Sequence, residues 1–339
     1  MSVDRSTQRR PTIMEVARLA GVSHQTVSRY LRFEGGLKTA TSERVASAIV
    51  ELDYRPNLLA RAMRSRKTGR LALLLPNGTA VSSLEMLAGA AAEASEAGYF
   101  VELVTLAGPP ELRAARVLEL ADSGLFEGIV SLTPLPLPAE RPGLRSTTPV
   151  LVAPNYDEHM RGIGEVADAS SMVEIIEGLA EQGHHTFLHV SGDYAHTSAR
   201  QRLEVYLDTL HRLGLRSYAV ADCSWSAPLA HRALLDLPDD SGVTAVIAAN
   251  DSLAAGAISG ARERGWDVPN DLSVTGWDNN PVAAAMAPAL TSVSIEHAIL
   301  GRHAVAQLLA VLGDQPQPPP HEPITHVVWR ASTGPAPRG

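Results

Sequence analysis

Apolar positions recur at two different spacings along the chain, and the change of spacing divides it into two parts. In the N-terminal part, residues 13–20 carry apolar side chains three and four positions apart, which is typical of one face of a helix. From Leu71 onward, short apolar runs alternate with amphipathic segments of helical period. Repeated strand and helix units of this kind predict parallel sheets with right-handed crossovers.

Turn signals bracket the helices of the N-terminal part. Thr12 and Glu15 form a T-x-x-E capping box, which predicts a helix start. Gly21 ends that helix, since glycine adopts the left-handed conformation at low cost, and Ser23 can cap the next one. Residues 45–52 mark a third helix. Two short helices with a tight connection and a third that closes the core predict a helix-turn-helix.

The remaining pattern sets the expected domains. Residues 1–56 form the helix-turn-helix domain, and residues 57–69 form a short helix and linker, in which the helix is too short to fold without a partner. Residues 70–339 form the body, whose N-lobe spans about 70–166 and 297–323 and whose C-lobe spans about 167–296 and 324–332. Ligands of such sheets bind at the carboxyl ends of the strands, in the crevice between lobes. The predicted strands are 71–75, 101–106, 128–132, 149–153, 186–191, 218–221, 244–248 and 272–276.

Charge is distributed very unevenly over these parts. The chain of 339 residues has a formal net charge of −8. Residues 1–70 hold 14 Lys and Arg against 6 Asp and Glu, a net of +8, so the rest carries −16. A basic head gains affinity for a polyanion by releasing condensed counterions, which favours nucleic acid as its partner. The alternative is a solvated basic tail.

Several other classes of protein are disfavoured by the composition. With 45% hydrophobic and 19% charged residues the chain is typical of a soluble globular protein, and no apolar run is long enough for a membrane helix or a signal peptide. Cys223 is the single cysteine, which excludes internal disulfides. We therefore expect a cytoplasmic protein with no cofactor. Neither the histidines at 184, 185, 189 and 196 nor the Gly162-x-Gly164 run has the context of a metal or dinucleotide site.

The second predicted helix carries a dense set of polar side chains at its start and exposed face. Arginine can bond bidentately to guanine and glutamine to adenine in the major groove, while serine and threonine hydroxyls hold phosphates. An ordinary polar helix face is the alternative, and the whole assembly makes it improbable. The set comprises Ser23, His24, Gln25, Thr26, Ser28 and Arg29.

The chain resembles the lactose-repressor (LacI/GalR) family of transcription factors in four blocks. These are T-I-M-E-V-A-R-L-A-G-V-S-H-Q-T-V-S-R at 12–29, L-D-Y-R-P-N-L-L-A-R-A-M at 52–63, A-N-D-S-L-A-A-G at 249–256 and S-V-T-G-W-D-N at 273–279. The resemblance covers nearly the whole chain. It implies a small all-α helix-turn-helix head and an α/β body of two Rossmann-like lobes, similar to type I periplasmic binding proteins.

The resemblance also assigns DNA contacts. It implies that His24, Gln25 and Arg29 read bases, and that the short helix after residue 56 folds with its dimer mate in the minor groove. This chain has Met63 where the family usually inserts a leucine, and Arg32 where the family commonly carries asparagine, which adds a phosphate contact. The full expected DNA-binding set is Ile13, Ser23, His24, Gln25, Thr26, Ser28, Arg29, Arg32, Asn57, Ala60 and Met63.

A small-molecule effector site is expected between the two lobes. Arg202 matches the family's effector-binding position, and Trp225 a position where the family often stacks an aromatic ring. Asn250 and Asp278 each follow a predicted strand, with Asp251 available to cap the next helix. Carboxylate, amide, guanidinium and indole together suit a sugar. The expected effector set is Asn77, Asn155, Ser198, Arg202, Trp225, Asn250 and Asp278.

These observations predict a ligand-responsive repressor of carbohydrate-metabolism genes that binds a pseudo-palindromic operator as a homodimer. Three alternatives remain open: a sugar-binding transport component, a co-repressor-dependent regulator of non-sugar metabolism, and a dehydrogenase-like enzyme with an appended DNA module. The first would need export and no basic head. The last would need a nucleophile, a base or a dinucleotide fingerprint, and the sequence shows none, so we expect no enzymatic activity.

Overall fold

A computed structural model describes residues 11–31, 37–55, 67–76, 81–135 and 148–337 of the chain. The chain divides into two compact units, the head (1–68) and the body (69–339).

The described part of the head is a bundle of three short helices. The predicted capping box is present: the Glu15 carboxylate accepts from the Thr12 amide at 2.7 Å, and the Thr12 hydroxyl accepts from the Glu15 amide at 3.4 Å. Gly21 ends the first helix with φ of 62°. Val16, Val27 and Val45, one from each helix, are fully buried against one another. The helices are α1 (Ile13–Ala20), α2 (His24–Leu31) and α3 (Thr39–Glu51).

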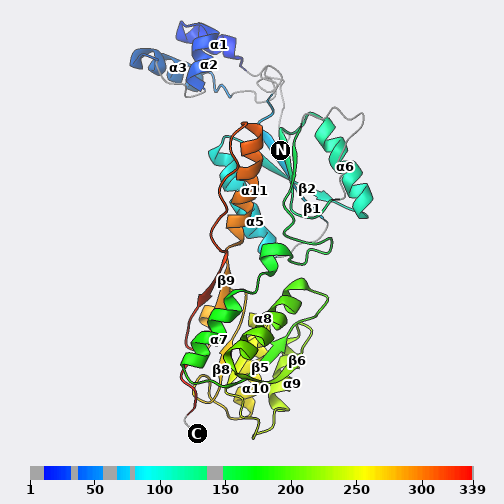
Figure 1. Cartoon of the computed structure of the whole chain (residues 1–339). Coiled ribbons are helices and arrows are strands. Elements are labelled where there is room, and N and C mark those ends of the chain that lie inside the picture. Colours follow the sequence, from blue (N-terminus) through cyan, green and yellow to red (C-terminus); the bar gives the residue numbers. More distant parts are fainter. Residues whose placement is uncertain (1–10, 32–36, 56–66, 77–80, 136–147, 338–339) are drawn as a thin grey trace, which may run out of the picture. The chain divides into compact units, whose positions relative to one another are not determined.

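The N-lobe of the body is a parallel sheet of order β2-β1-β3-β4 with helices on both faces (Figure 1). Along β1, Leu71, Leu73 and Leu75 pack against α5 and α11, while Ala72 and Leu74 pack against α6. The strand is therefore apolar on both faces, as a buried parallel strand must be. The elements are β1 (Arg70–Pro76), β2 (Phe100–Leu106), β3 (Gly128–Ser131), β4 (Val150–Val152), α5 (Val81–Glu96), α6 (Pro110–Asp122) and α11 (His297–Leu312).

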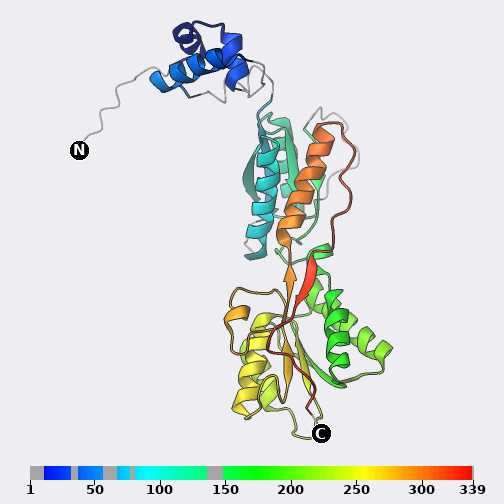
Figure 2. The same ribbon diagram turned by 90° about the vertical axis from the view of Figure 1, so that its left-hand side faces the viewer.

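Helices α5 and α11 lie side by side in both views of the body (Figure 2). A Cβ on Gly301 of α11 would lie 1.9 Å from the Met86 carbonyl oxygen, and one on Gly89 of α5 would lie 2.0 Å from the Ala298 carbonyl oxygen. Since real Cβ atoms never come so close, the two helices can pack at this distance only because both positions are glycine.

The C-lobe repeats this architecture around a parallel sheet of order β6-β5-β7-β8. Phe187 and Ile247 face α7 and α8, whereas Leu188 and Val246 face α9 and α10. The elements are α7 (Ser171–Glu181), β5 (Thr186–Ser191), α8 (Thr197–Leu213), β6 (Arg216–Asp222), α9 (Ala227–Leu235), β7 (Ala245–Ala248), α10 (Asp251–Glu263) and β8 (Ser273–Thr275), with short 3-10 helices at Gly164–Ala167 and Ala283–Ala285.

Two further strands join the lobes and form a separate antiparallel pair. β9 (Ser292–Ile295) precedes α11, and β10 (Thr325–Val328) returns from it, with Thr325 opposite Ile295. We call this pair the crossover ribbon. All eight predicted strands are present within two residues of their expected bounds, but the two strands of the ribbon were not predicted. β9 has the sequence S-V-S-I and β10 the sequence T-H-V-V, so neither is a continuous apolar run like those of the buried strands.

Several helices of the body end at glycines, and one long connection has no regular structure. Glycines at 98, 183, 214 and 265 all have positive φ, as expected where helices end. Residues 315–323, five of which are proline, carry no regular structure. Among the residues that the structure describes, no helix is long and apolar enough to cross a membrane.

Candidate functional site

The second helix of the head presents the predicted polar surface. Val27 is fully buried and holds α2 against the other helices. The Ser23 hydroxyl accepts from the Thr26 amide at 3.2 Å and so caps the helix. Ser23, His24, Gln25 and Arg29 are exposed, and Thr26 and Ser28 are half-buried. One side of α2 is therefore anchored in the core, and the polar residues that we predict to meet DNA lie on the other.

Of the remaining predicted DNA-binding residues, one packs against the core of the head and four are not described by the structure. Ile13 is half-buried and packs against the core of the head at the start of α1. Arg32, Asn57, Ala60 and Met63 lie outside the described residues.

In the body, the predicted effector residues of the C-lobe gather at the carboxyl ends of its parallel strands. Arg202, in the second turn of α8, is only 4% exposed. Its guanidinium donates to the Ala249 carbonyl oxygen at 2.5 Å, lies 4.4 Å from the centre of the Trp277 ring, and is 3.8 Å from the Asp278 carboxylate. Its Nε atom is buried without a hydrogen-bond partner among the described residues. A guanidinium held in place beside a carboxylate is suited to bind a polyol hydroxyl pair.

Asp278 lies at the edge of this arrangement, and the pKa of its carboxyl is raised. Although 45% of its side chain is open to solvent, the protein around the rest of it excludes water and raises the pKa of the carboxyl to about 6. The nearby Arg202 guanidinium lowers this pKa, and the Asp251 carboxylate raises it further. Asp278 can therefore act as a hydrogen-bond acceptor beside the Arg202 guanidinium.

Trp225 follows β6 and packs over the loop that follows β5. A Cβ on Gly192 would lie 2.4 Å from three atoms of the Trp225 ring, so the indole rests directly on the glycine backbone. The His196 ring meets the indole edge to face at 5.5 Å. The indole Nε1 atom is buried without a partner in the described part of the chain.

One expectation about the third strand end is wrong. Asn250, not Asp251, caps α10: the Asn250 side-chain oxygen accepts from the Leu253 amide at 2.9 Å. Asp251 instead points to the loop after β8, where it accepts from the Asn280 amide and the Ser292 hydroxyl, each at 2.6 Å. Asn250 is the last residue before the helix and has extended φ and ψ, the conformation of an N-cap, whereas Asp251 is already helical.

The other predicted effector residues are less closely joined to this group. Ser198 is half-buried in the first turn of α8. Asn155 follows β4 in the N-lobe, is 9% exposed, and its side-chain amide donates to the Ala153 carbonyl oxygen at 3.3 Å. Asn77 lies outside the described residues.

The structure adds three residues to the expected effector set. Trp277 forms the surface under the Arg202 guanidinium, Gly192 lets the Trp225 ring approach, and Asp251 organises the loop that bears Asp278. The glycine in Ser191-Gly192-Asp193 was the one available signal, since glycine after a strand often marks a close approach. The roles of the other two depend on contacts between distant segments.

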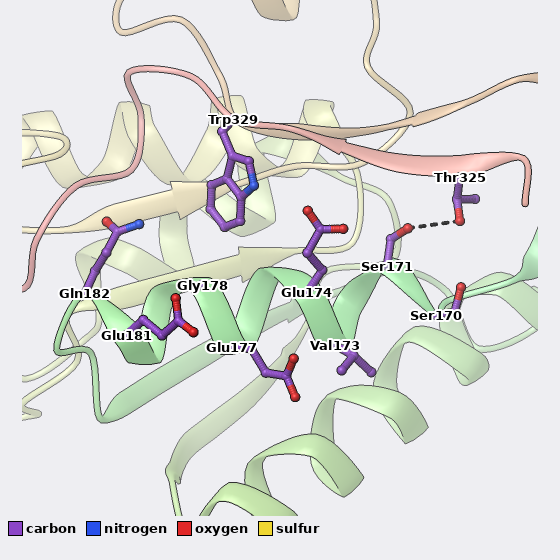
Figure 3. A pocket seen from close by; sticks show the side chains of 10 residues that line it. All are labelled: Ser170, Ser171, Val173, Glu174, Glu177, Gly178, Glu181, Gln182, Thr325 and Trp329. Atoms are coloured by element: carbon purple, nitrogen blue, oxygen red, sulfur yellow. Dashed lines mark hydrogen bonds between the residues drawn. The ribbon is translucent and has the colours of Figure 1, made fainter.

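A groove elsewhere in the described part of the body contains none of the predicted effector residues. It has a volume of about 970 Å³ and runs along α7, where the Trp329 ring covers Gly178 and the three α7 glutamates Glu174, Glu177 and Glu181 are among the lining residues (Figure 3). A smaller groove of about 560 Å³ is lined by residues of 164–169 and 201–205. The chemistry of the strand ends, not groove size, therefore identifies the candidate site.

Comparison with known proteins places both units. Residues 12–57 match the model for bacterial regulatory proteins of the lacI family, and residues 176–333 match a periplasmic binding protein-like domain. The HTH-type transcriptional regulator CelR of Thermobifida fusca is 29% identical over 351 residues, which cover 96% of this chain and 99% of that protein.

Solved structures agree with this assignment. A crystal structure of the lac repressor dimer bound to operator and the anti-inducer ONPF has a TM-score of 0.66 at 23% identity, over 96% of this chain and 100% of that one, and shows the likeness of fold. A complex of the transcriptional regulator CelR with cellobiose has a TM-score of 0.55 at 25% identity, over 95% of this chain and 100% of that one.

Proposed function

Since the chain belongs to the lacI family of bacterial regulatory proteins, we propose that it is a repressor of carbohydrate-metabolism genes that binds a pseudo-palindromic operator as a homodimer and responds to a sugar. The observation that carries the DNA-binding part is α2, whose buried Val27 turns a row of polar donors outward. A two-fold dimer presents two such helices and so requires a two-fold operator.

The C-lobe strand ends support the sugar part of the proposal. Sugars offer hydroxyl edges to charged groups and an apolar ring face to an indole. Arg202 and Asp278 supply a donor and an acceptor 3.8 Å apart, and Trp225 supplies the aromatic surface. The CelR relative, which is named in a complex with cellobiose, makes a disaccharide a reasonable first ligand to try.

The mechanism that we propose is reciprocal coupling between the two sites. A ligand that binds one arrangement of the lobes more tightly shifts the body toward that arrangement. In a dimer this changes the spacing of the segments that lead to the two heads, and operator affinity changes by the same factor as ligand affinity.

The rival functions lack this support. A transport component would have no use for the lacI-type head at 12–57. The members of this family are regulators and not enzymes, and the described residues of the candidate site include no arrangement of nucleophile and base that would favour catalysis. A co-repressor that is not a sugar remains an outcome of the ligand screen described below.

DNA binding is tested by a fluorescence-anisotropy titration of the full chain with DNA from upstream of its own gene, at two salt concentrations. Arg29→Ala should weaken binding by about 1–3 kcal/mol and relax the preference for the bound sequence. Arg232→Ala, which removes an exposed arginine of the body, is the matched control. Binding that is untouched by Arg29→Ala would contradict the assignment of α2.

The effector is tested by a thermal-shift screen of mono- and disaccharides, cellobiose among them, and of nucleobases. A sugar that stabilises the wild type should fail to stabilise Arg202→Lys, because an ammonium cannot reproduce the planar fork. Arg212→Lys is the matched control on the same helix, where the arginine pairs with Glu177 at the surface. Stabilisation by nucleobases alone would exclude the sugar, and a monomer in sedimentation at micromolar concentration would exclude the paired operator mechanism.

A further inference from the structure

The turn that carries Asp278 has a backbone that is costly to maintain. Asp278 and Asn279 follow each other with φ of 94° and 45°, both in the left-handed region. Residues other than glycine adopt this region less often, asparagine and aspartate more readily than most, and each such residue costs of the order of 1 kcal/mol. Two successive residues with positive φ persist only where contacts with the surrounding structure hold them. The contacts of Asp278 and Asn279 therefore show what fixes this turn.

The first set of contacts comes from β9 of the crossover ribbon. The Asp278 amide donates to the Val293 carbonyl oxygen at 2.9 Å, and the Asn279 amide donates to the Ser292 hydroxyl at 3.0 Å. The Asn279 side-chain amide reaches the Ser294 hydroxyl at 3.4 Å. The turn is thus bonded to three successive residues of a strand that joins the two lobes.

The second set comes from a single side chain at the other end of the ribbon. Arg330 lies two residues after β10, and its guanidinium donates to the Asn279 side-chain oxygen and to the Leu290 carbonyl oxygen, each at 2.7 Å. Its own amide donates to the Thr291 hydroxyl at 2.8 Å. One planar fork therefore joins the turn, the segment before β9 and the segment after β10.

We propose that Arg330 is a positioning residue, which fixes the Asn279 side chain and thereby ties the turn that presents Asp278 to the crossover ribbon. Arg330 acts through Asn279 and is not itself a ligand contact. Because the ribbon connects the lobes, the orientation of the Asp278 carboxylate and the geometry of the connection are set by the same contacts. The consequence for ligand binding rests on the function proposed above, whereas the position of Asp278 does not.

Two variants separate positioning from folding. Asn279→Gly removes both side-chain contacts but adopts the left-handed conformation without strain, so the fold should keep its stability. Arg330→Lys keeps the charge, but an ammonium on a flexible stem cannot reproduce a fork shared between Asn279 and Leu290. Arg232→Lys, at an exposed arginine paired with Asp236, is the matched control.

The position of Asp278 can be read without any ligand. The buried Trp277 ring is adjacent to Asp278 in the chain and lies under Arg202, so fluorotryptophan at this position, assigned with Trp277→Phe, should report the ionisation of the carboxyl by fluorine NMR. The charged groups that act on this carboxyl are Arg202 from α8 and Asp251 from α10. Asp278→Asn should abolish the inflection and so assign it.

In the wild type and in Arg232→Lys the inflection is expected near pH 6. In Asn279→Gly and Arg330→Lys it should move by about one pH unit or more toward the ordinary aspartate value, because a released turn exposes to water the part of the Asp278 side chain that the protein otherwise covers. A wild type without an Asp278-dependent inflection, or variants with the wild-type midpoint, would overturn the proposal. If the sugar screen yields a ligand, both variants should weaken it about tenfold; if it yields none, the proposed function fails while the titration still decides the role of Arg330.

Discussion

His189 makes the stability of the body depend on pH in a way that can be worked out from its surroundings. The ring lies on β5, is fully buried, stacks on Tyr206 at 4.9 Å, and has its Nδ1 atom 2.9 Å from the Ile247 carbonyl oxygen. Burial lowers its pKa to about 4, against the carbonyl contact that raises it, and the nearby Arg202 guanidinium lowers it further. Histidine in an unfolded chain titrates near 6.5.

The sign follows from these two values. The folded protein holds His189 neutral, so the unfolded chain binds the extra proton first as the pH falls. The contribution of the neutral ring is complete above about pH 6.5 and is lost progressively between about 6.5 and 4. A difference of about 2.5 pKa units corresponds to about 3.4 kcal/mol, of which about 2 kcal/mol is lost by pH 5.

The assay is urea unfolding of wild type and His189→Gln at pH 7.5 and pH 5. Glutamine keeps a donor for the Ile247 carbonyl oxygen and does not titrate, so other ionisable groups cancel in the difference between the two proteins. The stability advantage of the wild type should shrink by about 2 kcal/mol at pH 5. His185→Gln, at an exposed histidine directly before the same strand, should leave the pH dependence of the wild type in place. An advantage of His189 that is equal at both pH values would refute the argument.

Three further outcomes follow from packing and capping. Gly301→Ala, whose Cβ would lie 1.9 Å from the Met86 carbonyl oxygen, should destabilise the body by about 3 kcal/mol in the same unfolding assay. Gly313→Ala at the C-cap of the same helix, where the nearest neighbour of the added Cβ lies at 3.3 Å, should change the stability by less than about 0.5 kcal/mol. Equal effects of the two substitutions would contradict the close packing of α5 and α11. Thr12→Ala should destabilise the head by about 1 kcal/mol and speed amide hydrogen exchange in the first turn of α1, and unchanged exchange there would show that the capping box contributes nothing. Gly192→Ala should displace the Trp225 ring, since its Cβ would lie 2.4 Å from three ring atoms, and should shift the fluorescence of that tryptophan to the red; an unaltered Trp225 spectrum would count against the contact.

Much of the architecture could be predicted because it depends on residues close together in the chain. The capping box of α1, the glycine that ends it and the eight apolar strands are each encoded within a few positions, and all are present. The exposed polar face of α2 follows in the same way from the helical period, with Val27 inside and Gln25 and Arg29 outside. The effector residues at strand ends are a consequence of parallel topology, although their part in ligand binding stays a prediction.

Cases where local signals were ambiguous were decided by backbone conformation. Asn250 and Asp251 are both suitable helix caps, and the sequence favoured the wrong one. The choice depends on which of the two residues has extended φ and ψ, and on whether the other side chain finds hydrogen-bond donors on another segment. Asp251 finds two such donors, Asn280 and Ser292, that are 29 and 41 positions away.

By itself, then, the sequence determined the kind of protein: a basic head that displays a polar helix, and an acidic body of two α/β lobes with polar groups at the strand ends. Only the tertiary structure decided how those groups are held. The crossover ribbon pairs strands that are about 30 residues apart, and Arg330 meets Asn279 at a separation of 51. Such contacts leave no periodic trace in the chain, because their energy arises only when folding brings the donor and the acceptor together.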